Sequence, residues 1–232
     1  MKLLKKVIRG IKLCACYLAF RIRHQGVSYY PEGSLGEYYS QDGQDVYLSK
    51  LLFNKIDNLQ ASGVQPIFVD VGCNHPIKFS NSYFFEKYFK FKVLAVDPLD
   101  RYRILWEKYR SGSVFNECAL GEVEGEVELT VPLEGQVVDD MFSSLLNTSK
   151  LEGYEACKKS VKMKTLTQLL NEQSIKEVLI CSIDVEGFEL EVLKGLDFNQ
   201  FQIDCFCIEN NESNPYGSEE IRSFLLGKGY SF

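Results

Sequence analysis

Four acidic residues stand at the ends of short apolar runs, and their positions point to a shared site. They are Asp70, Asp97, Asp184 and Glu209. If the runs are parallel strands, their carboxyl ends meet at one edge of the sheet, where open α/β sheets bind their ligands. Carboxylates gathered there can accept hydrogen bonds, attract a cation or take up a proton. For any single one of them, capping of the following helix is an equally good alternative.

The first of these acids opens a tight turn, Asp70-Val71-Gly72-Cys73-Asn74. Its glycine lets the backbone approach a ligand, but the longer G-x-G-x-x-G pattern that places a pyrophosphate on a helix amino terminus is missing. Carboxylates suit S-adenosylmethionine, which has no phosphate and has a positive sulfonium. A nicotinamide-dependent oxidoreductase of Rossmann type remains the alternative enzyme. Asp97 could accept hydrogen bonds from the ribose hydroxyls of either cofactor.

Three residues are candidates for the base in a transfer to a hydroxyl group. Asp184 and Glu186 follow the fourth apolar run, and His75 is of a residue type that titrates near neutral pH. We prefer Asp184. The alternatives are a helix start at which Asp184 binds backbone N–H groups, and a structural His75 in a turn before proline. Asp184 and Glu209 could also form a two-carboxylate metal site, but no further spacing supports it and no metal is predicted.

These residues need a sheet that brings them together, and the apolar patterning predicts one. Short β-branched runs alternate with segments of helical periodicity, which is typical of a doubly wound, mostly parallel sheet in an α/β fold. Residues 126–131 alternate β-formers with acids and are predicted to add a hairpin. The predicted strands are residues 66–72, 92–98, 113–120, 178–184 and 203–209, and the predicted helices are residues 44–56, 81–89, 100–109, 165–173, 188–196 and 218–226.

Three stretches together resemble FkbM-type methyltransferases, and the resemblance runs from about Tyr39 to the carboxyl end. It implies a Rossmann-like class I methyltransferase fold, S-adenosylmethionine as donor, and O-methylation of a hydroxyl on a sugar-containing small molecule or glycan. The stretches are Ser40-Gln41-Asp42-Gly43-Gln44-Asp45, Val69-Asp70-Val71-Gly72-Cys73-Asn74-His75-Pro76 with Ser80-Asn81-Ser82, and Ser182-Ile183-Asp184-Val185-Glu186-Gly187-Phe188-Glu189 with Leu193-Lys194-Gly195.

The same resemblance implies roles for single residues in donor binding. The turn after the first strand would line the methionine end of the donor, the acid after the second strand would bind the ribose, and the end of the third strand would lie against the adenine. The residues so assigned are Asp70, Gly72 and Asn74 at the methionine end, Asp97 at the ribose, and Ala119 and Leu120 at the adenine. We expect Val71, Cys73 and Asp184 to contact the donor as well.

Residues 31–232 are predicted to form the methyltransferase domain, with one departure from the family pattern. The chain stops at Phe232, where such folds continue through a sixth strand and an antiparallel seventh. We therefore expect a sheet that lacks its last strands and has an exposed edge beside the fifth strand. An exposed edge is a site at which a homodimer could pair.

Residues 1–30 are predicted to form a basic amphipathic helix. Apolar residues such as Leu4, Ile8 and Ile11 fall on one helical face, and lysines and arginines fall on the other. The apolar run at residues 13–20 is too short to span a bilayer, which needs about 20 residues. The helix could lie on an anionic membrane through residues 1–24, or it could pack on its own domain or on a partner.

Composition narrows the class of protein further. The sequence has 26 lysines and arginines against 32 acidic residues, a formal net charge of −6, which argues against a nucleic-acid binder and favours a small-molecule or glycan acceptor. The eight cysteines lack paired zinc spacing and several lie in apolar runs, so we expect free thiols in a reducing, cytoplasmic environment, with peripheral contact to the inner membrane face left open. If the protein is not an enzyme, the alternative is a membrane-attached binding protein that retains the fold.

Overall fold

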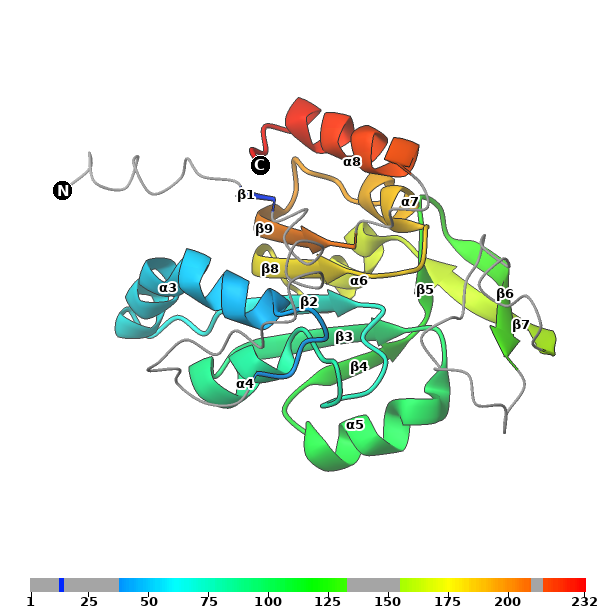
Figure 1. Ribbon diagram of the computed structural model, residues 1–232, viewed down its shortest axis with the longest axis horizontal. Helices are drawn as coiled ribbons and strands as arrows, with labels where there is room; N and C mark the ends of the chain where they lie inside the picture. The colour runs from blue at the N-terminus through cyan, green and yellow to red at the C-terminus, as the bar shows by residue number, and fades with distance from the viewer. Residues whose placement is uncertain (1–12, 15–37, 133–154, 210–214) are drawn as a thin grey trace.

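Five parallel strands form the centre of the molecule in the computed structural model, which describes residues 13–14, 38–132, 155–209 and 215–232. Their order across the sheet is β4-β3-β2-β8-β9 (Figure 1). In chain order this is third, second, first, fourth, fifth, so the direction of winding reverses beside β2, as in doubly wound folds. The strands are β2 (Ile67–Val71), β3 (Lys92–Asp97), β4 (Val114–Glu117), β8 (Glu177–Ile183) and β9 (Gln202–Ile208).

Helices cover both faces of the sheet. Successive strand residues point to opposite faces, and because both faces are apolar, each needs a layer of helices to bury it. Phe68 belongs to one apolar core and its neighbour Val69 to the other. The first core also takes in α3 (Gln44–Ala61), α4 (Tyr83–Phe89) and α5 (Arg103–Tyr109), and the second takes in α6 (Leu166–Glu172), α7 (Glu189–Lys194) and α8 (Pro215–Gly227). A short 3₁₀ helix, η1 (Asp100–Tyr102), precedes α5. The predicted doubly wound sheet and its helices are thereby confirmed.

A second, three-stranded sheet was predicted only in part. The predicted third strand is split into two. β4 ends at Glu117, and β5 (Ala119–Leu120) belongs to a different sheet, whose strand order is β5-β7-β6. In that sheet β6 (Gly125–Pro132) runs antiparallel to β7 (Ala156–Lys164), which the sequence did not predict. Val161 is the one buried residue of β7, and the lysines of this strand are exposed or half-buried. The strand therefore lacks the alternation of apolar and polar residues by which a strand is predicted. Only one residue, Cys118, therefore separates the end of β4 from the start of the small sheet.

The amino-terminal segment is described only at β1 (Leu13–Cys14). Leu13 pairs in parallel with Cys205 of β9, so these two residues extend the sheet and are not part of a continuous helix. The strand edge expected to be exposed beside β9 is occupied there. The rest of the predicted helix, and the membrane contact predicted for residues 1–24, lie outside the described residues and stay predictions. Among the described residues, no helix is long and apolar enough to cross a membrane.

The Ser40 to Asp45 motif forms the amino-terminal cap of α3. The Asp45 carboxylate is fully buried and accepts hydrogen bonds from the Tyr39 N–H (2.6 Å), the Ser40 N–H (3.1 Å) and the Ser40 hydroxyl (2.5 Å). In return, the Asp45 N–H donates to the Ser40 hydroxyl at 3.2 Å. A β-bridge between Ser40 and Phe79 then places this motif beside the loop that follows β2. Its role is to position that loop.

Candidate active site

The carboxyl ends of three adjacent strands are tied together by backbone hydrogen bonds. The Asp184 N–H donates to the Val71 carbonyl at 3.0 Å, and the Glu209 N–H donates to the Ile183 carbonyl at 2.9 Å. The turn after β2 is joined to β3 in the same way, since the Gly72 N–H donates to the Val96 carbonyl at 2.9 Å. The predicted acids therefore leave their strands at one edge of the sheet.

Gly72 is required by the packing of this edge. Its φ of +78° lies in the left-handed region, and a Cβ atom there would stand 1.8 Å from the backbone oxygen of Asp184. No side chain fits at that distance. The glycine of the acid-x-Gly turn thus sets how close the donor-binding turn comes to the end of β8, in addition to any contact with a ligand.

Asp97 lies half-buried at the end of β3 and accepts hydrogen bonds from two backbone N–H groups. Asn74 donates to one carboxylate oxygen at 3.0 Å, and Leu99 donates to the other at 2.9 Å. Burial raises the pKa of Asp97 to about 6, and these two N–H groups oppose that rise. Each carboxylate oxygen has a second lone pair, so Asp97 can hold its loop and still accept a hydroxyl.

Three carboxylates gather beyond β8 and β9. Ligand oxygens of Asp184, Glu186 and Glu209 all lie within 4.8 Å of one another. Burial raises the pKa of Asp184 well above its usual range, and the negative charges of Glu209, Glu186 and Glu189 raise it further. Like charges this close favour sharing of a proton. Their spacing would also suit a divalent cation, a use that the sequence left open for Asp184 and Glu209 without predicting a metal.

Glu189, the first residue of α7, holds the turn that joins β8 to this helix. The Glu189 carboxylate accepts the Val185 N–H at 3.2 Å and the Gly187 N–H at 3.0 Å. It is buried, and burial raises its pKa against the lowering effect of those N–H groups. Because Glu189 and not Asp184 accepts these two N–H groups, they give no support to the capping role that was the alternative for Asp184.

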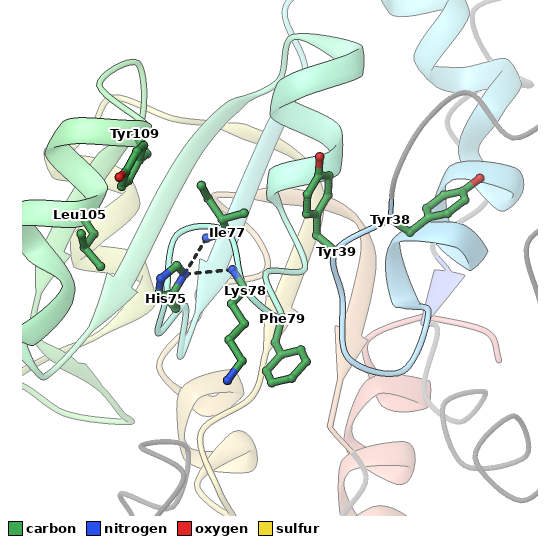
Figure 2. Close-up of a pocket in the computed structure, with 8 residues that line it drawn as sticks. All are labelled: Tyr38, Tyr39, His75, Ile77, Lys78, Phe79, Leu105 and Tyr109. Atoms are coloured by element: carbon green, nitrogen blue, oxygen red, sulfur yellow. Dashed lines mark hydrogen bonds between the residues drawn. The ribbon is translucent and has the colours of Figure 1, made fainter. Parts of the chain in front are cut away.

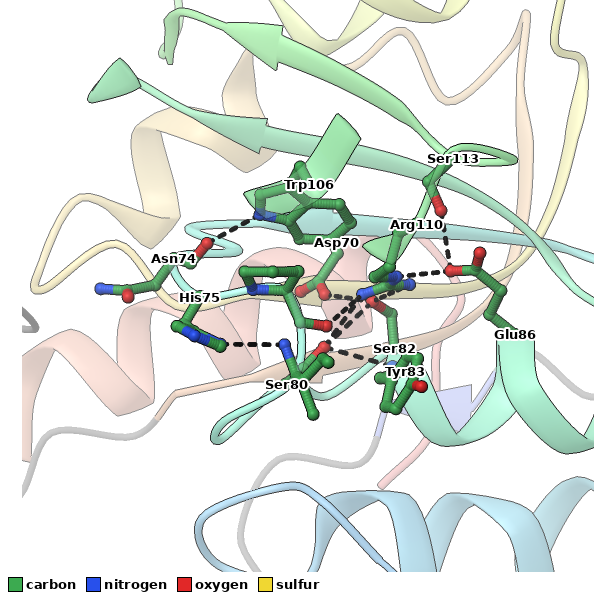
Figure 3. A network of polar contacts seen from close by, with 12 residues as sticks. Asp70, Asn74, His75, Ser80, Ser82, Tyr83, Glu86, Trp106, Arg110 and Ser113 are labelled. Atoms are coloured by element: carbon green, nitrogen blue, oxygen red, sulfur yellow. Dashed lines mark hydrogen bonds and ion pairs between the residues drawn. The ribbon is translucent and has the colours of Figure 1, made fainter. Parts of the chain in front are cut away.

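A buried arginine, Arg110, organises the loop between β2 and α4 (Figure 3). Its guanidinium donates to the Pro76 carbonyl and the Ser80 hydroxyl, both at 3.1 Å, and to the Ser82 hydroxyl at 3.0 Å. Its Nε pairs with Glu86 at 2.5 Å. The side chain is 2% exposed, so nearly all of its interactions are with the protein. These contacts give a role to the Ser80-Asn81-Ser82 motif.

Asp70 belongs to this buried network. The Ser82 hydroxyl donates to the Asp70 carboxylate at 2.5 Å. Burial raises the pKa of Asp70, and the Ser82 hydrogen bond and the Arg110 charge oppose that rise. The network also reaches the donor turn, since the indole N–H of Trp106, which stacks under Arg110, donates to the Asn74 carbonyl at 2.8 Å. Sequence reasoning missed Arg110, because one arginine after an amphipathic helix looks like any surface residue.

His75 has a structural role in the same loop (Figure 2). Its Nδ1 accepts the Ile77 N–H at 3.0 Å and the Lys78 N–H at 2.9 Å. The neutral ring therefore carries its proton on Nε2, which makes that nitrogen a donor. Burial lowers the pKa of His75, and the Lys78 charge lowers it further. Protonation would disrupt both backbone bonds, so the geometry favours Asp184 over His75 as the base.

Four residues assigned to donor binding have side chains packed in the cores. Val71 and Leu120 lie in the core with α6 to α8, Cys73 lies in the core with α3 to α5, and Ala119 packs with Leu99. Their side chains are at most 5% exposed. Any contact that these four residues make with a ligand therefore goes mainly through their backbone groups.

One buried polar atom at this edge is open to a ligand group. The Asn81 amide donates to the Ser182 hydroxyl at 3.0 Å, two residues before Asp184. Its carbonyl oxygen is buried and has no hydrogen-bond partner among the described residues. An unpartnered buried acceptor is unfavourable. Together with Asp97 and the carboxylate cluster, it fits a ligand that carries ribose hydroxyls and positive charge, as S-adenosylmethionine does.

The sheet order, the acid-x-Gly turn and the carboxylates beyond the strands define a Rossmann-like protein of the methyltransferase class. Residues 70–232 match the Methyltransferase FkbM domain, a match over more than half of the chain. The chain therefore belongs to the FkbM methyltransferase family. This confirms the resemblance carried by its sequence motifs.

A curated relative agrees with this family. The chain is 29% identical over 166 residues to methyltransferase sdnD of Sordaria araneosa, in an alignment that covers 60% of this chain and 63% of that protein. The match thus spans less than two thirds of the relative. No solved structure matches the chain.

The role of Gly72 can be tested by substitution. Gly72→Ala places a Cβ against the Asp184 backbone at a left-handed position, so we expect the free energy of unfolding to fall by about 2 kcal/mol or more. Gly227, at the end of α8, has nothing within 4 Å of an added Cβ. Gly227→Ala should leave stability unchanged or raise it by up to about 1 kcal/mol. Equal denaturant midpoints for the two variants would contradict the packing role.

Proposed function

We propose that the protein is an S-adenosylmethionine-dependent O-methyltransferase that acts on a hydroxyl of a sugar-containing small molecule or glycan. The observation that carries the proposal is the carboxylate cluster of Asp184, Glu186 and Glu209 at the carboxyl edge of a family-typical sheet. A weakly acidic hydroxyl needs a base in the transition state, and this cluster contains a carboxyl whose pKa is raised.

The residues would share the work as follows. S-adenosylmethionine supplies an electrophilic methyl group on a positive sulfonium. Asp97 would accept the ribose hydroxyls, and the turn from Asp70 to Asn74 would hold the methionine end. Asp184 would accept the proton of the acceptor hydroxyl as the new oxygen–carbon bond forms, and Glu209 and Glu186 would keep its pKa high enough for this. Alignment of the two reactants would supply much of the remaining acceleration.

The two alternatives have less support. A nicotinamide-dependent oxidoreductase would need a pyrophosphate site, whereas the turn after β2 lacks the second and third glycines and sits beside carboxylates. A non-catalytic binding protein has no need for three carboxylates within 4.8 Å of one another, because their mutual repulsion is unfavourable.

The role of Asp184 is tested by Asp184→Asn. The amide keeps the shape and removes the base, so single-turnover methyl transfer at saturating donor should slow by about a hundredfold or more, with donor affinity changed only several-fold. Asp197, whose carboxylate caps the Asn199 N–H at 2.9 Å, is a matched control. Asp197→Asn should transfer methyl groups at the parental rate. A rate for Asp184→Asn within threefold of the parent would exclude it as the base and shift the assignment to Glu186.

The charge coupling in the cluster predicts a pH effect. The base must be ionised to act, so activity should rise with pH as the Asp184 carboxyl loses its proton. Glu209→Gln removes a negative charge that raises the pKa of Asp184, and the acidic limb of the rate profile should therefore move to lower pH. Measurements in EDTA would exclude a bound cation as the cause.

Glu191→Gln is the control for this shift, because Glu191 lies on α7 and pairs with Lys194 at 3.1 Å. It should leave the midpoint of the acidic limb in place. A midpoint that stays in place or moves to higher pH in Glu209→Gln would show that the three carboxylates do not titrate as a coupled group.

A further inference from the structure

A groove lined largely by aromatic side chains surrounds the loop that follows the donor turn (Figure 2). Its volume is about 490 Å³, within the range of small-molecule sites. Three segments build it: the residues before α3, the loop after β2, and α5. It is lined by Tyr38, Tyr39, His75, Ile77, Lys78, Phe79, Leu105 and Tyr109.

Three lysine ammonium groups lie close to aromatic rings of the groove. The Lys78 ammonium lies 4.8 Å from the centre of the Phe79 ring, the Lys87 ammonium 5.2 Å from that of Tyr39, and the Lys108 ammonium 4.9 Å from that of Tyr109. All three lysines are exposed. Of the described residues that line the groove, none is acidic, although the chain as a whole has a net charge of −6.

The groove also offers a fixed hydrogen-bond donor. Because Nδ1 of His75 accepts two backbone N–H groups, Nε2 carries the proton. The His75 ring packs edge-on against Tyr102, with 5.2 Å between ring centres, which holds its orientation. His75 follows Asn74 directly, so the groove and the donor turn share one rigid loop.

We propose that this groove binds the acceptor, and that the acceptor is an anionic sugar, one that carries a phosphate or a carboxylate. Aromatic faces pack against the C–H face of a sugar ring, and ammonium groups with a histidine N–H bind a phosphate or carboxylate through charge-assisted hydrogen bonds. That the ligand is an acceptor with a sugar hydroxyl rests on the proposed function. That it carries a negative charge is inferred from the lysines and the histidine N–H of the groove.

An anionic membrane is the competing ligand for a basic aromatic surface. Contact with a membrane favours long cationic chains around an apolar face that inserts. Here Lys78 and Lys108 lie over the rings of Phe79 and Tyr109, which would have to insert, and the Lys87 ammonium donates a hydrogen bond to the Tyr39 hydroxyl at 2.5 Å. A discrete ligand fits this arrangement better.

The test compares matched sugars on the full-length protein. Methyl glucoside, methyl glucuronide and glucose 6-phosphate are titrated by ligand-observed NMR, with S-adenosylhomocysteine binding measured on the same samples. The two anionic sugars should bind at least about tenfold more tightly than the neutral one. Lys78→Gln should weaken the anionic sugars by about threefold to tenfold and leave the neutral one unchanged, whereas Tyr109→Leu should weaken all three.

Lys176→Gln is the matched control, because Lys176 is also exposed and lies over an aromatic ring, that of Phe201 at 4.7 Å, beside the start of β8. It should change none of the three affinities. Equal binding of neutral and anionic sugars, or an equal effect of Lys176→Gln, would overturn the proposal. So would a Lys78→Gln protein that loses binding to phosphatidylserine vesicles and keeps its sugar affinities. Sugar selectivity without S-adenosylhomocysteine binding would support the groove and overturn the proposed function.

Discussion

The arrangement of the site depends on the close approach of two backbones, at Gly72 and Asp184. Only a residue without a side chain fits against the Asp184 carbonyl, and the hydrogen bond from the Asp184 N–H to Val71 holds the two strand ends together. The turn that would bind the donor and the carboxylate that would take the proton are thus placed by one contact. The parallel pairing of β2 with β8 makes that contact possible.

Buried charge then fixes the loop above this contact. Arg110 is enclosed by Ser80, Ser82 and Glu86, and a buried guanidinium is tolerated only where its donors are satisfied. The loop between β2 and α4 therefore has little freedom, and the same loop binds the buried Asp70 of β2 through Ser82 and contributes His75 to the groove. The turn after β2 and the aromatic groove are thus both shaped by this one loop.

Much of this could be predicted from the sequence because it is local. The β-branched runs predicted the five strands of the main sheet, and strand-end acids such as Asp184 predicted the edge where carboxylates gather. What the sequence could not predict depends on distant contacts. The burial of Arg110 requires partners about thirty residues earlier in the chain, and β7 is specified by its pairing with β6, since Val161 is its one buried residue. The hydrogen bonds from Val185 and Gly187 to Glu189 likewise need the folded turn.

The central claim is that the carboxyl edge of the sheet binds an adenosyl donor of methyl groups, and calorimetry of the full-length protein tests it most directly. S-adenosylhomocysteine and NAD are titrated separately into the parent protein and into Asp97→Asn. The account predicts that S-adenosylhomocysteine binds the parent, that Asp97→Asn weakens this by about 1 kcal/mol or more through loss of ribose hydrogen bonds, and that NAD gives no heat of binding. Binding of NAD without binding of S-adenosylhomocysteine would contradict it.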